Sequence, residues 1–495
     1  WTSLEVRELG PLEPGDAEAL ARAALGARAT DEAALRIVEQ SDGSPLAIEQ
    51  LALAELEGRA HRTPPTLLAL AQARLAGLDE EQRLRLRAAS IFGGRVELSG
   101  VAALLSGTEL GALEAGLEAL CAVGLLSRSA SGAARYAFRS SLLRDAAYAT
   151  LTDEDRELGH RLAAGYLAEH AQARDAPIVA HHYDAGGDPR QAAIWFAKAA
   201  ELALEANAFE RAAELAGRGA LAGATGMLLG RVRLLETEAF RHAGRNAEMF
   251  RAGLSGMEHL PWRSPPWWTA YANAVLGAIR LGEKAELARL AAMASSGVLA
   301  DLPAAAARAA HYLQFAGQRE PADELLAAVS QKLGAFAEDP ARWGWAYRAH
   351  ATRALLGGDV GGYLAQLELA VRSFATSGDV RELTLERANL GFARSELGLY
   401  EEAVHVLKEA LTSAERLGLA HTAAVATQNL GVALAKLGQH EQGRALLEEA
   451  LRRFTAQRNA RMAGNTRSSS SRVLLAMGDA QGALELALAG VADLE

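Results

Sequence analysis

Residues 390–410 read LGFARSELGLYEEAVHVLKEA, and residues 430–450 read LGVALAKLGQHEQGRALLEEA. The two stretches share two Leu-Gly pairs and, further on, a small residue, a leucine and an alanine at equal offsets. The glycine of the second pair recurs at forty-residue intervals, as Gly358, Gly398, Gly438 and Gly478. Self-similarity at a fixed period indicates a protein built from stacked repeats.

Each unit has the pattern of a helical hairpin. A glycine after an apolar periodic run suits the left-handed residue that ends a helix, because it has no Cβ. The second helix then begins with Glu401-Glu402 or Glu441-Gln442, which suit the positive end of a helix dipole. Ala403 and Gly443 follow, and such small residues let paired helices approach closely. Neither helix can bury its apolar face alone, so the hairpins must stack into an α-solenoid.

These units resemble the tetratricopeptide repeat, whose Leu-Gly pair and later small and alanine positions match Leu390-Gly391, Ala403 and Ala410. The unit is longer than that family's 34 residues and looks like the extended variants of large bacterial regulators. Weaker units can be traced upstream through Gly317, Gly282, Gly244 and Asn207. In the last unit Ser470-Ser471 replaces Leu-Gly, which predicts poorer packing and a fraying end of the solenoid.

The composition narrows the classes of partner and the compartment. The 495 residues carry 51 basic and 61 acidic side chains, and this net charge of -10 is dispersed, which argues against a nucleic-acid or membrane surface. A single cysteine, Cys121, excludes an internal disulfide framework and fits a reducing cytoplasm. No apolar run is long enough to span a bilayer. We therefore expect a cytoplasmic protein with protein partners, no nucleic acid and no membrane contact.

The first third of the chain has a different pattern. Helical periodicity covers residues 11–26, 31–40, 67–78, 80–92 and 110–123, and two alternating runs at 124–129 and 135–140 predict a hairpin. Helices followed by a hairpin suggest a winged helix. Its segment 110–123 contains Glu114 and Glu118 but no lysine or arginine, so DNA contact through this segment is not expected.

Four phrases in this region, in order, resemble bacterial signal-transduction ATPases with numerous domains. They are Leu9-Gly10-Pro11-Leu12, Gly43-Ser44-Pro45-Leu46, Arg87-Ala88-Ala89-Ser90-Ile91-Phe92 and Tyr136-Ala137-Phe138-Arg139. In that family a nucleotide-binding core is followed by a lid, a winged helix and a superhelical sensor arm. The resemblance implies a lid remnant over residues 1–62, a winged-helix domain over 63–155 and tetratricopeptide-like repeats over 156–495.

The resemblance also indicates which part of such a protein this chain contains. The chain opens at Trp1 rather than at a methionine, and no Gly-x-x-x-x-Gly-Lys-Ser/Thr loop that would cradle phosphates occurs in it. We expect the downstream part of a longer protein, with no complete active site and no cofactor of its own. ATP or ADP would be bound only by the full-length protein, whose upstream output could be a Ser/Thr protein kinase.

Two positions are candidates for nucleotide contact by this resemblance. Gly43 and Pro45 match the lid's Gly-x-Pro motif, in which the proline packs against adenine. The same residues are also how one helix ends and the next begins. Ser140 stands where many relatives place a histidine that reaches the phosphates. Because serine brings no positive charge, the resemblance implies a weaker hold on a diphosphate.

Two further clusters have a structural and a functional interpretation. His181-His182 could suggest a metal site, but adjacent residues of a helix point about 100° apart, and no other ligands have metal spacing. Trp262, Trp267 and Trp268 could form an aromatic ligand patch, whereas packing at an irregular junction between repeats explains them more simply.

The function that follows is regulatory. The repeats would bind a protein, peptide or small-molecule effector on their concave face and control an upstream nucleotide-binding core, with self-association on activation. The alternative is a stand-alone scaffold that binds partners without nucleotide. No arrangement of nucleophile, base and oxyanion donors supports an enzyme.

Overall fold

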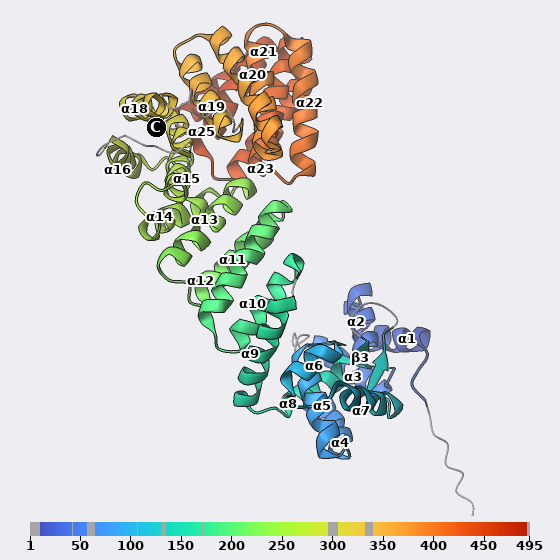
Figure 1. The fold of residues 1–495 in the computed structure, drawn as a ribbon. Helices are drawn as coiled ribbons and strands as arrows, with labels where there is room; N and C mark the ends of the chain where they lie inside the picture. Colours follow the sequence, from blue (N-terminus) through green and yellow to red (C-terminus); the bar gives the residue numbers. More distant parts are fainter. Residues whose placement is uncertain are drawn as a thin grey trace, which may run out of the picture. The chain divides into compact units, whose positions relative to one another are not determined.

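The structure, a computed structural model, describes residues 10–41, 43–56, 65–105, 107–129, 135–170, 172–295, 305–331 and 340–492. This part of the chain contains twenty-six α-helices, two short 3₁₀ helices and one small three-stranded sheet. The helices form two compact units that divide between Ala192 and Ala193 (Figure 1). The predicted all-α fold is confirmed.

The N-terminal unit begins with three helices that pack on one another around Ala17, Ala21, Ile37 and Ile48. They are α1 (Pro14–Leu25), α2 (Asp31–Ser41) and α3 (Pro45–Leu56), with a 3₁₀ turn η1 (Gly26–Arg28) after the first. The Thr30 hydroxyl accepts a hydrogen bond of 3.2 Å from the Ala33 amide and caps α2. Helices α1 and α2 lie within or close to the predicted segments 11–26 and 31–40, and α3 begins at Pro45, where the sequence indicated a helix start.

A second core of the N-terminal unit lies between helices and the sheet. Its elements are α4 (Pro65–Ala76), α5 (Glu80–Ile91), β1 (Arg95–Val96), α6 (Leu98–Leu104), α7 (Leu110–Ala122), β2 (Leu126–Arg128), β3 (Tyr136–Phe138) and α8 (Ser141–Ala149). The strands are antiparallel in the order β1-β3-β2, with Leu126 opposite Phe138 and Val96 opposite Tyr136. The predicted hairpin is present. Strand β1 and helix α6 were not predicted, because elements this short show no period.

The remaining helices follow one another as hairpins. They are α9 (Asp153–His170), η2 (Ala173–Asp175), α10 (Ala176–Ala185), α11 (Pro189–Glu205), α12 (Phe209–Leu221), α13 (Gly226–Ala243), α14 (Asn246–His259), α15 (Pro265–Leu281), α16 (Lys284–Ser295), α17 (Ala305–Phe315), α18 (Arg319–Ser330), α19 (Pro340–Leu356), α20 (Val360–Ser377), α21 (Val380–Glu396), α22 (Tyr400–Arg416), α23 (Ala420–Lys436), α24 (His440–Ala456), α25 (Ala460–Ala476) and α26 (Ala480–Ala492). The C-terminal unit, from Ala193 onward, is a tetratricopeptide-like α-solenoid. Within the described residues no helix combines the length and apolar character that crossing a membrane requires.

The glycines that defined the repeat have the predicted role. Gly358, Gly398, Gly438 and Gly478 follow the first helices of their hairpins with φ between 81° and 88°. Asn207 takes the same place after α11 with φ 59°, a conformation that asparagine tolerates better than most residues. At Gly443 a Cβ would lie 2.7 Å from the carbonyl oxygen of Gly431, so α23 and α24 pack backbone against backbone.

The expectation of a fraying last repeat is wrong. The serine run lies inside α25, a continuous helix that packs against α26 and also against α15. Ser469 and Ser470 are buried, and a Cβ at Gly490 of α26 would lie 3.3 Å from Cβ of Arg467 and 3.6 Å from the Ser468 nitrogen. Small side chains here replace the Leu-Gly pair because another helix occupies the space.

The three tryptophans serve mainly as packing. Trp267 and Trp268 are buried in the largest core of the C-terminal unit, where Trp267 stacks on Tyr271 at 5.2 Å between ring centroids. Trp262 is 56% exposed and lies edge-on to Trp267. The interpretation as a junction between repeats therefore fits two of the three side chains.

Candidate functional site

The first helices of the hairpins from α13 to α25 form a series whose ends meet. Helix α13 packs against α23, and α15 packs against α25, although the partners lie far apart in the sequence (Figure 1). Between α19 and α21 the link includes ion pairs of Arg348 with Glu382 and Glu386. The seven helices α13, α15, α17, α19, α21, α23 and α25 therefore close into what we call the ring.

The ring lines a partly open cavity of about 310 Å³, to which each of its seven helices contributes at least one side chain. This volume lies at the lower end of the range for small-molecule sites. Aromatic and aliphatic groups form part of the wall. The polar lining residues are Arg241, His242, Arg280, His311, Arg348, Asn389, His421, Thr422, Gln428, Asn429, Asn459, Arg461 and Asn465. The described residues that line the cavity include four arginines and no carboxylate.

Two of these arginines, Arg241 and Arg348, form ion pairs with a buried carboxylate that does not line the cavity. Glu382 of α21 accepts from Arg241 at 2.7 Å and from Arg348 at 2.6 Å, and all three side chains are buried. Burial alone would raise the pKa of Glu382, but the two guanidinium groups outweigh it and hold this pKa well below its usual value. Arg348 also pairs with Glu386 and lies over the Trp345 ring at 4.2 Å.

The ion-pair network continues along the inner face of the solenoid. Glu238 of α13 accepts from Arg308 of α17 at 2.8 Å and from the Asn273 amide of α15 at 2.7 Å. Burial would raise the pKa of Glu238, yet Arg308 and Arg241 together lower it. Since each carboxylate joins two helices, the network fixes the spacing of successive hairpins.

The other two arginines have no carboxylate partner in the described part of the chain. Arg280 of α15 is 6% exposed and donates to the Asn246 side-chain oxygen at 3.0 Å. Burial lowers its pKa to about 10; Tyr312 opposes this shift, and Arg241, Arg308 and Arg461 add to it. Arg461 of α25 is partly buried and lies over the Phe315 ring at 4.8 Å.

The histidines around the cavity are neutral near pH 7. His242 accepts a hydrogen bond from Arg241 at 2.9 Å through Nε2, and its pKa is held well below the usual value by burial and by Arg241. His311 pairs with the Thr352 hydroxyl at 2.8 Å, and its pKa is lowered by burial and by Arg348. Thr352 is 2% exposed and does not line the cavity, so it cannot act as a nucleophile on a bound molecule.

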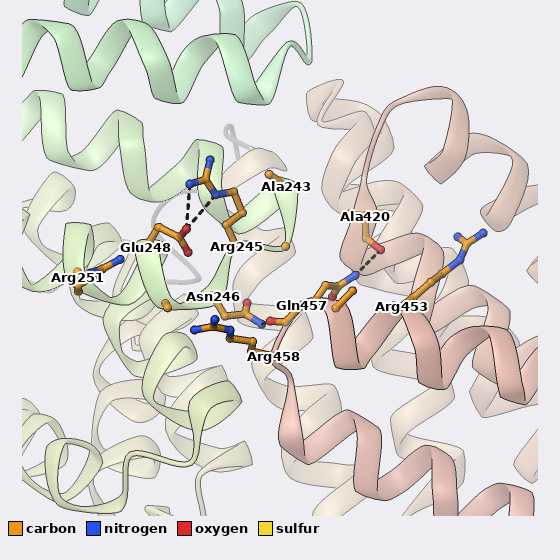
Figure 2. Close-up of a pocket in the computed structure, with 12 residues that line it drawn as sticks. Ala243, Arg245, Asn246, Glu248, Arg251, Ala420, Arg453, Gln457 and Arg458 are labelled. Carbon is orange, nitrogen blue, oxygen red and sulfur yellow. Dashed lines mark hydrogen bonds and ion pairs between the residues drawn. The ribbon is translucent and has the colours of Figure 1, made fainter.

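A second hollow, of about 550 Å³, marks the seam where the ring closes (Figure 2). Gly244, between α13 and α14, has φ 75°, and its Cβ position lies 2.9 Å from Cγ of Gln457. The Asn246 amide donates to the Gln457 carbonyl at 2.6 Å, and the Gln457 amide donates to the Ala420 carbonyl at 3.0 Å (Figure 2). Asn246 also accepts a hydrogen bond from Arg280, which lines the cavity, so this bond links the seam to the cavity.

The predicted nucleotide contacts lie in the N-terminal unit. Gly43 has φ 72°, its carbonyl accepts from the Leu12 amide at 2.9 Å, and a Cβ there would lie 2.8 Å from the Leu12 oxygen. Pro45 is the exposed first residue of α3. Ser140 is buried and caps α8 through a 3.3 Å bond from the Leu143 amide. Helices α2 and α8 touch, and a nucleotide contact at these residues stays a prediction.

The paired histidines separate as predicted, with His181 exposed and His182 buried. His182 and His160 share a 2.9 Å contact between their Nδ1 atoms, and Tyr148 lies 2.9 Å from Nε2 of His160. Burial lowers the pKa of His160 to about 4 and that of His182 to about 3. Among the described residues no cluster of three or more potential metal ligands was found.

The acidic side chains of α7 form ion pairs and a hydrogen bond with residues in or beside strands β2 and β3. Glu118 pairs with Arg128 at 2.8 Å and accepts from the Tyr136 hydroxyl at 2.9 Å, while Glu114 pairs with Arg135 at 2.9 Å. Burial and the Glu118 carboxylate raise the pKa of Tyr136 to about 12. These contacts join α7 to strands β2 and β3 and to the residue before β3.

The chain matches no family model, and no curated protein matches it in sequence. One solved structure with a similar arrangement of helices is PH0952 from Pyrococcus horikoshii, a signal transduction ATPase with numerous domains that has a tetratricopeptide repeat sensor. The two chains are 16% identical, the match covers 98% of this chain and 68% of that chain, and the TM-score is 0.41. Others are the Cut9-Hcn1 tetramer of APC/C, at 15% identity over 92% and 82% with a TM-score of 0.43, and aspartyl phosphate phosphatase F from Bacillus subtilis, at 9% over 98% and 96% with a TM-score of 0.35. At these identities and TM-scores the likeness concerns the helical arrangement and assigns neither ligand nor activity.

The cavity residues were not predicted from the sequence, although the repeat carried a signal for them. Leu385, Val425 and Asn465 stand forty residues apart and all line the cavity. So do Asn389 and Asn429, each directly before a Leu-Gly pair. Polar side chains at one phase of the repeat marked the inner face. The ring closure that brings α15 to α25 has no local signature.

Proposed function

We propose that this chain is the cytoplasmic sensor arm of a bacterial signal-transduction ATPase, and that the ring cavity receives the effector. The observation that carries the proposal is the cavity itself, lined by side chains from all seven helices of the ring. A ligand there would contact elements from both ends of the solenoid at once. Its binding would therefore favour the closed ring over an opened one.

The volume of the cavity distinguishes between the expected classes of partner, which are a small molecule, a peptide and a folded protein. About 310 Å³ accommodates a small molecule or the end of a peptide, whereas a folded protein would need an open concave surface. In the full-length protein, ring closure would be coupled to the lid around Gly43 and Pro45. A stand-alone scaffold would show the same ligand binding without any nucleotide dependence.

A substitution that reduces the volume of the cavity but keeps all of its charged side chains tests this proposal. Asn465→Phe places an aromatic ring among the lining residues, and Ser468→Phe places the same ring on an exposed position of the same helix. We expect metabolites from a cell extract that raise the melting temperature of the wild type and of Ser468→Phe to lose this effect on Asn465→Phe. Equal stabilisation of all three proteins would contradict a ligand in the cavity.

Coupling to nucleotide needs the full-length protein. Pro45→Glu should weaken ATP or ADP binding in calorimetry if the lid motif packs against adenine. Unchanged nucleotide affinity, or no nucleotide binding by the full-length protein at all, would favour the stand-alone scaffold.

A further inference from the structure

The charges of the cavity do not balance. Arg241 and Arg348 share Glu382, and Arg308 is paired with Glu238, so these cations are compensated within the protein. Arg280 and Arg461 also belong to this region, and neither forms an ion pair with a described carboxylate. Burying a cation without a counter-charge is costly. Arg280, which is buried, and Arg461, which is partly buried, therefore lack a counter-charge among the described residues of the cavity.

One residue that lines the cavity, Asn459, has a buried hydrogen-bond donor without an acceptor among the described residues. Asn459 is 1% exposed, lines the cavity and precedes α25 as its cap residue. Its oxygen accepts from the Met462 amide at 3.3 Å, while its Nδ2 is buried with no hydrogen-bond partner among the described residues. An N–H group in this state requires an acceptor.

We propose that the ring cavity binds a small organic anion, a carboxylate or a phosphate ester, whose charged group lies between Arg280 and Arg461 and accepts from the Asn459 amide. This inference rests on the proposed function, since it names the chemistry of the ligand that the ring would receive. Guanidinium groups suit the purpose because their planar N–H donors match the oxygens of carboxylate and phosphate.

The remaining lining residues of the cavity indicate the chemistry of the uncharged part of the ligand. Tyr312, Phe315, Tyr363 and Phe392 provide flat apolar surface, and Gln428 and Asn429 offer both donors and acceptors. An anion with an apolar or hydroxyl-bearing body of modest size fits this lining. Neutral His311 and His421 add no further positive charge near pH 7, because burial, with Arg348 near His311 and Arg280 near His421, holds their pKa values low.

Binding of the anion would also act on ring closure. Arg280 belongs to α15 and Arg461 to α25, the two helices that meet across the ring. Arg280 is joined through Asn246 to the Gln457 carbonyl at the seam. An anion shared by the two arginines would therefore link both sides of the closure.

The test uses differential scanning fluorimetry and calorimetry with inorganic phosphate, glucose 6-phosphate and benzoate, and with glucose and benzamide as neutral counterparts. We expect at least one anion to raise the melting temperature of the wild type at millimolar concentration while its neutral counterpart does not. Arg280→Gln and Arg461→Gln should each weaken binding roughly tenfold or more. Arg280→Lys and Arg461→Lys should retain part of the affinity, and Arg444→Gln, on the exposed face of α24, should retain all of it.

The apo protein provides a second readout. Because Arg461 is a cation without a carboxylate, Arg461→Gln should leave the melting temperature without ligand unchanged or raise it. A marked decrease would show a structural role and overturn the assignment, as would anion binding by the two glutamine variants that is as strong as binding by the wild type. If neutral probes bind and anions do not, the anion site fails while a ligand cavity stands. If no probe of either kind binds, the anion proposal fails, and the extract experiment with Asn465→Phe decides whether the cavity receives another ligand.

Discussion

Arg348 shows how one side chain stabilises the inner face of the solenoid. Arg348 is 1% exposed, and its guanidinium group pairs with Glu382 and Glu386 of the next hairpin and lies against Trp345 and Phe374. Burial lowers the pKa of such a group, but the two carboxylates outweigh burial and raise it. A buried network of this kind is most sensitive to the loss of one member, because the remaining charges then stay buried without a partner.

Replacing Arg348 by glutamine should therefore destabilise the protein by about 3–5 kcal/mol, since Glu386 would lose its only ion pair among the described residues. Arg372→Gln is the matched control, because Arg372 is 73% exposed and its pair with Glu368 spans 3.9 Å. The control should change stability by less than about 1 kcal/mol. Urea unfolding followed by circular dichroism measures both, and similar losses in the two variants would refute the role of the network.

At the scale of helices, the decisive contact is the close approach of α23 and α24. The Cβ of a residue at 443 would meet the Gly431 oxygen, and a Cβ at 431 would meet the Gly443 oxygen at 2.9 Å. This contact was predictable from the sequence, since a small residue at 443 was expected to let the helices approach. The hairpins of the last repeats, their turn glycines and the helices over residues 11–26, 31–40, 67–78, 80–92 and 110–123 could be predicted for the same reason, because they follow from local periodicity.

Gly443→Ala should accordingly cost about 1–3 kcal/mol, because the added methyl group must push the two backbones apart. Gly361→Ala is the control: Gly361 is an exposed residue of α20 whose Cβ position has only Asp359 within 4 Å, at 3.7 Å. There, alanine should stabilise by up to about 1 kcal/mol. Thermal unfolding of the two variants should move in opposite directions, and parallel changes would contradict the packing.

At the scale of the whole molecule, buried neutral histidines make the fold sensitive to acid. His160 and His182 in the N-terminal unit, and His242, His311 and His421 in the C-terminal unit, all have pKa values lowered chiefly by burial. Below about pH 6.5 the unfolded chain binds protons that the folded chain cannot, so the free energy of unfolding decreases as the pH is lowered.

We expect the midpoint of urea unfolding to decrease from pH 6.5 towards pH 4, the folded pKa of His160, with each buried histidine contributing about 1.4 kcal/mol per pH unit. His311→Gln should make this dependence shallower. His405→Gln should not change it, because His405 is 77% exposed. A midpoint that stays constant or rises on acidification would show that these groups are not buried in the neutral form.

The closure of the ring lies beyond what local sequence patterns can predict. Arg280 and Arg461 come from helices separated by most of the solenoid, and they share a cavity only because α15 meets α25. The repeat phase of Asn389 and Asn429 indicated an inner polar face, but the curvature that turns this face into a cavity depends on all the hairpins together.

The most direct test of this closure is a cross-link at the seam, in a Cys121→Ser background that removes the single native thiol. Gly244→Cys with Gln457→Cys places two thiols where a Cβ at 244 already lies 2.9 Å from Cγ of Gln457. The control pairs Gln457→Cys with Gly282→Cys, a glycine of similar φ with nothing near its Cβ position. Under mild oxidation, mass spectrometry should find an intramolecular disulfide in the first protein and free thiols in the second. Free thiols in both proteins would show that the solenoid does not close into a ring.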